Sequence, residues 1–146
     1  MSRHTAREKA LKFLYQLEIR RGSREDQQEG FFQLEPLNDE MDRAYFDRLI
    51  RGVGDHRSSI DSIIAGYLRG WTMDRQLLID LSILRLAVFE ILFDTEVPPE
   101  IAISEAVIFA NDYGTDQSRS FINAVLGSIE KNEQRLAETV GGSEDG

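Results

Sequence analysis

The segment LLIDLSILRLAVFEIL, residues 77–92, is the most informative part of this sequence. Its apolar side chains would point in nearly every direction around a helix, and the charged residues Asp80, Arg85 and Glu90 interrupt them. A helix that is apolar nearly all round usually lies at the centre of a fold. The sequence therefore predicts a central helix over about residues 73–93, with other helices packed around it.

Apolar residues recur at helical spacing in the segments on both sides of this helix. The capping-box pattern at residues 5–8 predicts a first helix that begins near Thr5. A short helix is predicted around Phe31, Phe32 and Leu34, and further helix starts are predicted at Asn38 or Asp39, at residues 97–100 with Pro99 in the first turn, and at Thr115 or Asp116. The pattern leaves open whether residues 55–58 form a kink or a break. No segment has the alternation of a strand, so the predicted fold class is all-α.

The chain of 146 residues is long enough for one domain with a single core. We expect a single domain over residues 1–138, built from two helical halves at about 1–69 and 71–138. Gly70-Trp71-Thr72 is the predicted connector between them. The remaining residues, 139–146, are rich in glycine, serine and acidic side chains, and they are predicted to form a disordered tail.

Charge is distributed unevenly along the chain, which has a formal net charge of −9. Residues 1–24 contain seven basic and two acidic side chains, whereas the rest of the chain is strongly acidic. A basic end on an acidic body can hold a phosphate locally while the body repels nucleic acid. The same composition fits a first helix whose lysines and arginines are simply solvated. Charge alone leaves both interpretations open.

The composition argues against several kinds of chemistry. The chain has no cysteine, which excludes disulfides, thiolate metal sites and a cysteine nucleophile. Its two histidines, His4 and His56, lack the spacing of metal ligands, and the sequence has no glycine-rich phosphate loop. We therefore expect a protein that is not an enzyme and that uses no cofactor or metal. Without a long apolar run or a signal-peptide pattern, the expected location is the cytoplasm.

Four segments, in order and with their spacings kept, resemble the NusB family. They are AREKALKFLYQ at 6–16, Trp71 with MDR at 73–75 and DLSILRLAVFEI at 80–91, VP at 97–98 with IAISEAV at 101–107, and FINAVL at 121–126. The resemblance covers most of the chain and loosens only in residues 21–40 and in the tail. It implies two small helical bundles packed together.

The resemblance also implies a role in bacterial transcription antitermination. NusB proteins bind boxA, a single-stranded RNA element, jointly with NusE, a small-subunit ribosomal protein. The pair helps to load an antitermination complex onto RNA polymerase at ribosomal RNA operons. The family positions that face NusE match Tyr15, Glu18, Asp80 and Glu90 of this sequence. Tyr15 could equally continue the apolar stripe of the first helix, and Glu90 could pair with a neighbouring charge.

By the same resemblance, RNA is expected along the N-terminal basic segment and the start of the last helix. The expected phosphate contacts are Arg3, His4 and Arg7, and the residues expected nearer the bases are Ser118, Phe121 and Asn123. Arg3 and Arg7 are four residues apart, which would place both on one face at the positive N-terminal end of a helix. Phe121 could instead pack in the core, and Asn123 could brace a neighbouring loop.

The N-terminus departs from the family pattern. Arg3-His4-Thr5 is a thinner cationic stretch than the arginine run that NusB proteins often have, and Asn111 and Ser120 stand where lysine is frequent. Fewer cations should weaken RNA binding. The sequence therefore leaves open a NusB-like protein-interaction domain with weak or lost RNA binding. A NusB-like domain of the kind fused to ribosomal RNA cytosine methyltransferases is a further alternative, which a length of 146 residues disfavours.

Overall fold

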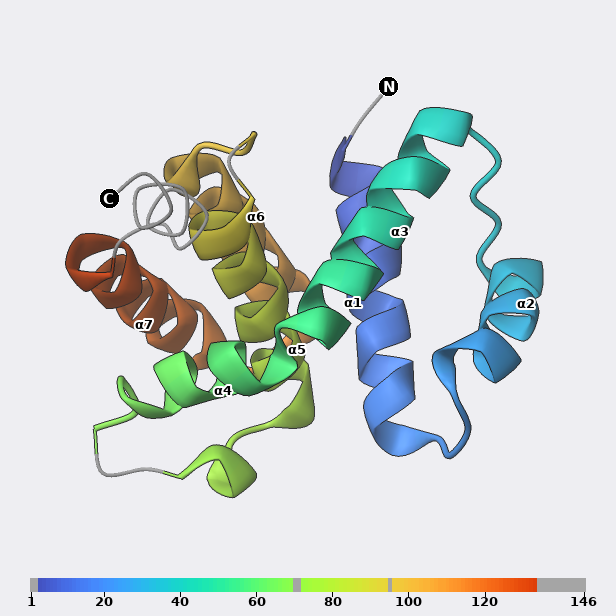
Figure 1. Cartoon of the computed structure of the whole chain (residues 1–146). Helices are drawn as coiled ribbons and strands as arrows, with labels where there is room; N and C mark the ends of the chain where they lie inside the picture. Colours follow the sequence, from blue (N-terminus) through green and yellow to red (C-terminus); the bar gives the residue numbers. More distant parts are fainter. Residues whose placement is uncertain (1–2, 70–71, 95, 134–146) are drawn as a thin grey trace, which may run out of the picture.

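The structure is a computed structural model, and it describes residues 3–69, 72–94 and 96–133. Every regular element in these ranges is a helix, which confirms the predicted all-α class (Figure 1). The elements are α1 (Arg3–Ile19), α2 (Arg24–Leu34), α3 (Glu40–Asp55), α4 (Arg57–Ala65), the 3-10 turn η1 (Met73–Arg75), α5 (Leu78–Val88), the π-helical turn η2 (Phe89–Phe93), α6 (Pro99–Tyr113) and α7 (Ser118–Asn132). The predicted connector residues 70–71 and the predicted tail 139–146 lie outside the described residues.

Helix α5 lies at the centre, as the apolar pattern predicts. All its residues from Asp80 to Val88 are buried. It contacts α1, α4, α6 and α7, while α1 packs chiefly on α3 and α6 packs chiefly on α7. Figure 1 shows α1, α2 and α3 grouped on one side of the molecule and α6 and α7 on the other. The division of one domain into halves at residue 70 stays a prediction.

The single helix predicted over residues 73–93 is wrong in detail, because this segment forms three elements. After η1, the backbone is extended at Gln76 and Leu77, with ψ of 153° and 139°, and α5 begins only at Leu78. Leu77 is 47% exposed, so the chain reaches the surface at this point before it enters the core. At the other end, the last five residues widen into η2, which carries Glu90.

The open question at residues 55–58 is resolved as a tight break at His56. Helix α3 ends at Asp55, and the His56 N–H donates to the carbonyl of Gly52 at 3.1 Å before α4 begins. The His56 ring stacks on Phe93, with centroids 4.2 Å apart. A Cβ at position 52 would lie 2.2 Å from the ring of Phe89, so α3 can pass this close to η2 only with glycine there.

The short helix predicted around Phe31, Phe32 and Leu34 is present as the last part of α2, which begins earlier in the chain. The Ser23 side chain accepts from the Asp26 N–H at 3.1 Å and caps a helix that starts at Arg24. Four aromatic rings then join α2 to α1 and α3, with centroids 4.8–6.0 Å apart in the contacts that link Phe13, Phe31, Phe32 and Phe46. These contacts fix α2 against the core and place its outer face beside α3.

Candidate nucleic-acid and partner interface

The N-terminal turn of α1 presents Arg3 and His4 at the surface. The Arg3 guanidinium carbon lies 4.6 Å from the centre of the Tyr45 ring, and its Nη2 lies 3.6 Å from the Glu96 carboxylate. The His4 ring stacks on Phe109, with centroids 5.2 Å apart, and its Nδ1 lies 2.8 Å from Glu105. Both side chains keep about two-fifths of their area exposed. They can therefore reach a phosphate, in competition with an acidic neighbour.

Arg7 is not part of this surface, and its expected contact with phosphate is corrected here. It is 4% exposed. Its Nε donates to both oxygens of Glu90 at 2.9 and 3.0 Å, and its Nη1 donates to Glu105 at 3.2 Å. The guanidinium is therefore held inside the protein by the carboxylates of Glu90 and Glu105.

The same network corrects the expectation that Glu90 faces a partner. Glu90 is 1% exposed, and it also accepts a hydrogen bond from the Tyr45 hydroxyl. Burial raises the pKa of Glu90, while the Arg7 charge opposes that shift. Burial also raises the pKa of Tyr45, and the adjacent Glu90 carboxylate adds to the shift. The role of Glu90 is therefore internal, since it joins η2 to α1 and α3.

A hollow of about 450 Å³ lies where the start of α5 meets the start of α7. It brings together Asp80, Ser118 and Phe121, three residues that the sequence singled out on separate segments. Leu77 forms part of its wall. Ser118 is positioned by the α6–α7 turn, because its Oγ accepts from the Thr115 N–H at 2.9 Å. The lining also includes the Arg75 guanidinium and the polar side chains of Gln76, Thr115 and Gln117, so the hollow holds one cation and one carboxylate.

Asp80 is the chemically unusual group in this hollow. It is 6% exposed, and its Oδ1 has no hydrogen-bond partner within the part of the chain that the structure describes. Burial raises the pKa of Asp80, and the nearby Ser118 hydroxyl opposes the shift. A buried carboxylate that lacks a cation costs free energy unless a partner supplies one. Arg75 lines the same hollow, but no ion pair between Arg75 and Asp80 occurs in the part of the chain that the structure describes, so the Asp80 carboxylate is still without a cation.

Replacing Asp80 with asparagine should raise the free energy of unfolding near neutral pH by about 1 kcal/mol, because a neutral isostere removes a buried unpaired charge. Since the folded-state pKa of Asp80 is raised, this cost is absent below the unfolded-state pKa of about 3.9. The cost of the buried Asp80 charge appears as pH rises from the unfolded-state pKa to the folded-state pKa, and it is fully present above the folded-state pKa. The stabilisation should therefore shrink on acidification, which urea unfolding at several pH values measures. An Asp80→Asn protein no more stable than the wild type at neutral pH would contradict the assignment.

Tyr15 and Glu18 lie on the later turns of α1, and both are half-buried. Glu18 accepts from Arg57 at 2.9 and 3.1 Å and lies 3.5 Å from Arg85 of α5. Arg85 in turn donates to Asp61 at 2.8 Å. Glu18 is thus held by two arginines, which weakens the case for a direct partner contact. No described contact brings Tyr15 or Glu18 to the hollow that contains Asp80.

The remaining expected RNA residues lie on α7. Phe121 is half-buried. One side of it packs against the core, as one of its two predicted roles requires, and it also lines the hollow, where it could contact a base. Asn123 is exposed. Sequence reasoning did not identify Tyr45, Glu96 and Glu105 as neighbours of the N-terminal cations. The residues between His4 and Glu105 number about a hundred, and no local pattern signals that they meet.

Taken together, the fold and the surface define a class of small all-helical proteins. This chain is built round a central apolar helix, and it has a cationic first turn and a surface hollow that contains a buried carboxylate. The chain belongs to the NusB family, whose sequence pattern matches residues 4–131.

Two curated relatives are similar over most of the chain. The transcription antitermination protein NusB of Acetivibrio thermocellus is 40% identical over 131 residues, which cover 90% of this chain and 90% of that protein. The protein of the same name from Bacillus velezensis is 36% identical over 129 residues, which cover 88% of this chain and 95% of the relative.

Solved structures have the same fold. T. maritima NusB superposes with a TM-score of 0.83 at 34% identity, covering 92% of this chain and 94% of that one. NusB from a crystal structure of the antitermination factors NusB and NusE in complex with dsRNA gives a TM-score of 0.82 at 26% identity, covering 88% and 96%. Within the described ranges, no helix has both the length and the apolar character needed to cross a membrane.

Proposed function

We propose that the chain is an RNA-binding transcription antitermination factor, which binds boxA RNA together with NusE and supports ribosomal RNA transcription. The observation that carries the proposal is the likeness over 88% of the chain to a NusB solved with NusE and dsRNA. The names of the curated relatives support the same function. The proposed site of action is the bacterial cytoplasm, where RNA polymerase works, and the proposed role is binding without catalysis.

The RNA contacts in this proposal are Arg3 and His4 on α1 and Phe121 and Asn123 on α7, while Ser118, which is 1% exposed, shapes the α6–α7 turn next to them. Helix α6 connects the two groups, because Glu105 contacts His4 and the α6–α7 turn positions Ser118. The positions of Glu105 and Gly114 are about 14 Å apart along α6 at 1.5 Å per residue. A short single strand can span that separation, with phosphates at one end and unstacked bases at the other.

The partner contact in this proposal is centred on Asp80. NusE would supply a lysine or arginine to the Asp80 carboxylate, which is 6% exposed and would have to turn toward the hollow to meet it, while the exposed Leu77 and Leu78 provide apolar contact area beside it. Tyr15 and Glu18 remain proposed contacts on α1, separate from the hollow that contains Asp80. A charge pair that becomes desolvated on binding is a typical centre of a specific interface.

A second candidate function is a NusB-like protein-interaction domain that binds RNA weakly or not at all. It is favoured by the electrostatics of the N-terminal turn, where Glu96 and Glu105 occupy Arg3 and His4 and where Arg7 is buried. In that case NusE would bind through Asp80 while RNA added nothing.

Purified chain added to a reconstituted transcription reaction tests the proposed function. On a template that carries boxA before a terminator, read-through should increase when the chain and NusE are both present. A template with a scrambled boxA is the control. Read-through that does not depend on boxA, or that NusE produces alone, would overturn the proposal.

Arg3→Ala should weaken RNA binding and lower the slope of log affinity against log salt by about 0.7, the value for one phosphate contact on a single strand. Glu96→Gln should have the opposite effect on affinity, because it releases Arg3 and Arg48 from a carboxylate at 3.6 and 3.2 Å. Fluorescence anisotropy at several salt concentrations measures both. Arg21→Ala, which removes an exposed arginine from the α1–α2 loop, is the matched control. Equal slopes for the Arg3 and Arg21 variants would place the phosphate contact elsewhere.

A further inference from the structure

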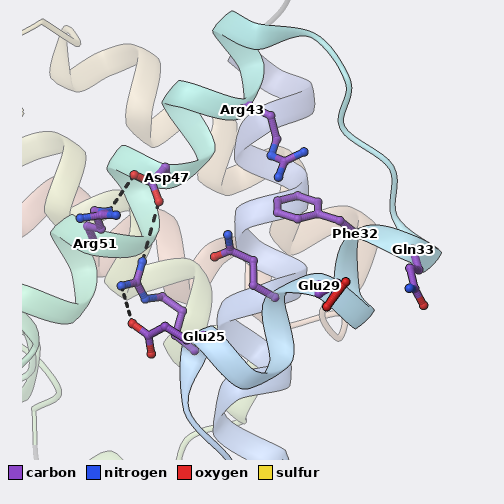
Figure 2. Close-up of a pocket in the computed structure, with 9 residues that line it drawn as sticks. Glu25, Glu29, Phe32, Gln33, Arg43, Asp47 and Arg51 are labelled. Atoms are coloured by element: carbon purple, nitrogen blue, oxygen red, sulfur yellow. Dashed lines mark hydrogen bonds and ion pairs between the residues drawn. The ribbon is translucent and has the colours of Figure 1, made fainter.

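A hollow of about 650 Å³ lies between α2 and α3, away from the residues assigned above (Figure 2). Its floor is Phe32, which is half-buried and packs against Phe46 with ring centroids 4.9 Å apart. The Arg43 guanidinium carbon lies 3.9 Å from the centre of the Phe32 ring, and Figure 2 shows the two side chains next to each other. The Phe32 ring, and the Arg43 guanidinium that contacts it, are therefore fixed to the aromatic core.

The arginines of this hollow differ in their partners. Arg24 lies 2.9 Å from Glu25 and 3.8 Å from Asp47, and Arg51 lies 2.7 Å from Asp47. Arg43 donates to the carbonyl of Leu37 at 3.3 Å and, in the described ranges, has no carboxylate within ion-pairing distance. Of the three arginines, Arg43 is thus the one that contacts an aromatic ring. One face of its guanidinium lies on Phe32, and the other face points away from that ring.

These groups suit a nucleobase better than a phosphate or an acidic peptide. A guanidinium plane stacks on a base, as aromatic side chains do, and the amides of Gln28 and Gln33 supply both donors and acceptors for a base edge. The paired acids neutralise Arg24 and Arg51, and Glu29 adds negative charge. A polyanion would gain little inside the hollow, because the carboxylates there offset the arginines. A nucleobase is uncharged and can enter the hollow while the phosphate of its nucleotide stays in solvent.

The outer face of α3 connects this hollow to the N-terminal RNA surface. A second hollow, of about 330 Å³, lies beside the same helix and is lined by Arg3, Tyr45 and Arg48. Ala44 lines it too and follows Arg43 directly in the sequence. The two hollows therefore border the same turn of α3, and a strand held by Arg3 can continue round this helix to Arg43.

We propose that the α2–α3 hollow binds one unpaired base of the RNA strand that continues beyond boxA, with the base stacked on Arg43. This inference rests on the proposed function, since it extends the RNA contact from the N-terminal turn across α3. It assigns Arg43, Phe32 and the two glutamines to sequence-tolerant recognition, because every base has a face that can stack.

The test compares three RNAs in the presence of NusE: boxA alone, boxA extended by about five unpaired nucleotides on either side, and the same extension built from abasic nucleotides. Wild-type protein should bind the base-bearing extension about fivefold or more tightly than boxA alone, as expected from one stacked base. The abasic extension should give little gain. Arg43→Ala and Arg43→Lys should each lose the gain while keeping their affinity for boxA alone. Arg21→Ala should keep both.

Each other outcome has a definite meaning. An abasic extension that binds as well as the base-bearing one would overturn base stacking, and so would an Arg43→Ala protein that retains the gain. Weaker binding of NusE by the Arg43→Ala protein, without RNA, would assign the hollow to a protein and also overturn the inference. Wild-type protein that fails to bind boxA at all would overturn the proposed function and this extension together. Circular dichroism confirms that each variant is folded.

Discussion

Asp80→Lys should abolish binding of NusE while the protein stays folded. The reversal puts a cation where the hollow now offers a buried carboxylate without a partner, so a basic group from NusE would be repelled instead of bound. Loss of a desolvated charge pair costs about 2–5 kcal/mol of binding free energy, and reversal costs more. Isothermal titration calorimetry measures the affinity, and circular dichroism and urea unfolding measure the fold.

Two further variants keep this prediction decisive. Glu130→Lys makes the same charge reversal at an exposed position of α7 and should leave NusE binding unchanged. Asp80→Asn keeps the shape of the side chain, is expected to stabilise the free protein, and should still weaken the complex at least about tenfold. Normal NusE binding by a folded Asp80→Asn protein would remove Asp80 from the interface.

Glu90→Ala should lower the free energy of unfolding by about 3–5 kcal/mol, because it leaves the Arg7 guanidinium buried without its main counter-ion. Urea unfolding should show a lower midpoint with an unchanged slope. Arg7→Met combined with Glu90→Leu should recover much of the loss, since apolar pairs often replace buried ion pairs with little cost. The exposed pair of Arg51 and Asp47 supplies the control, and Arg51→Ala should cost less than about 1 kcal/mol.

A loss below about 1 kcal/mol in Glu90→Ala would mean that Arg7 finds water or another partner, and the buried network would not hold α1 in place. That network matters for function because it determines where the first turn of α1 lies. Arg7 joins α1 to η2 and α6, and Arg3 and His4 lie about one turn before Arg7 on the same helix. The surface cations are therefore positioned by buried charges.

The sequence was sufficient to predict the central helix and the all-α class, since both follow from apolar periodicity. It was insufficient for Arg7. The spacing of Arg3 and Arg7 suggested one exposed face, but Arg7 also lies four residues before Leu11, which is 1% exposed. In the first turns of α1 the apolar residues include the small Ala6 and Ala10, so the sequence pattern did not show which side of the helix is buried. Glu90 on an apolar helix was the available signal that a buried counter-ion was needed.

Helix α2 could have been predicted in full from Ser23, since a serine followed by acidic residues is a helix-start pattern. The hollow at Asp80 could not have been predicted, because it forms only where the first turns of α5 and α7 pack together. Ser118 and Phe121 were expected at an RNA surface and Asp80 at a protein surface, and no local rule indicates that these positions are neighbours. Their proximity suggests that RNA and NusE bind next to each other.

The most direct measurement of the central claim is the affinity of labelled boxA RNA for the chain, with and without NusE, at two salt concentrations. The account predicts that NusE raises the RNA affinity about tenfold, that boxA RNA raises the affinity for NusE by the same factor, and that added salt weakens RNA binding. A scrambled RNA should show no such coupling. An RNA affinity that is unmeasurable under all four conditions, or that is identical for boxA and scrambled RNA with NusE present, would contradict the account.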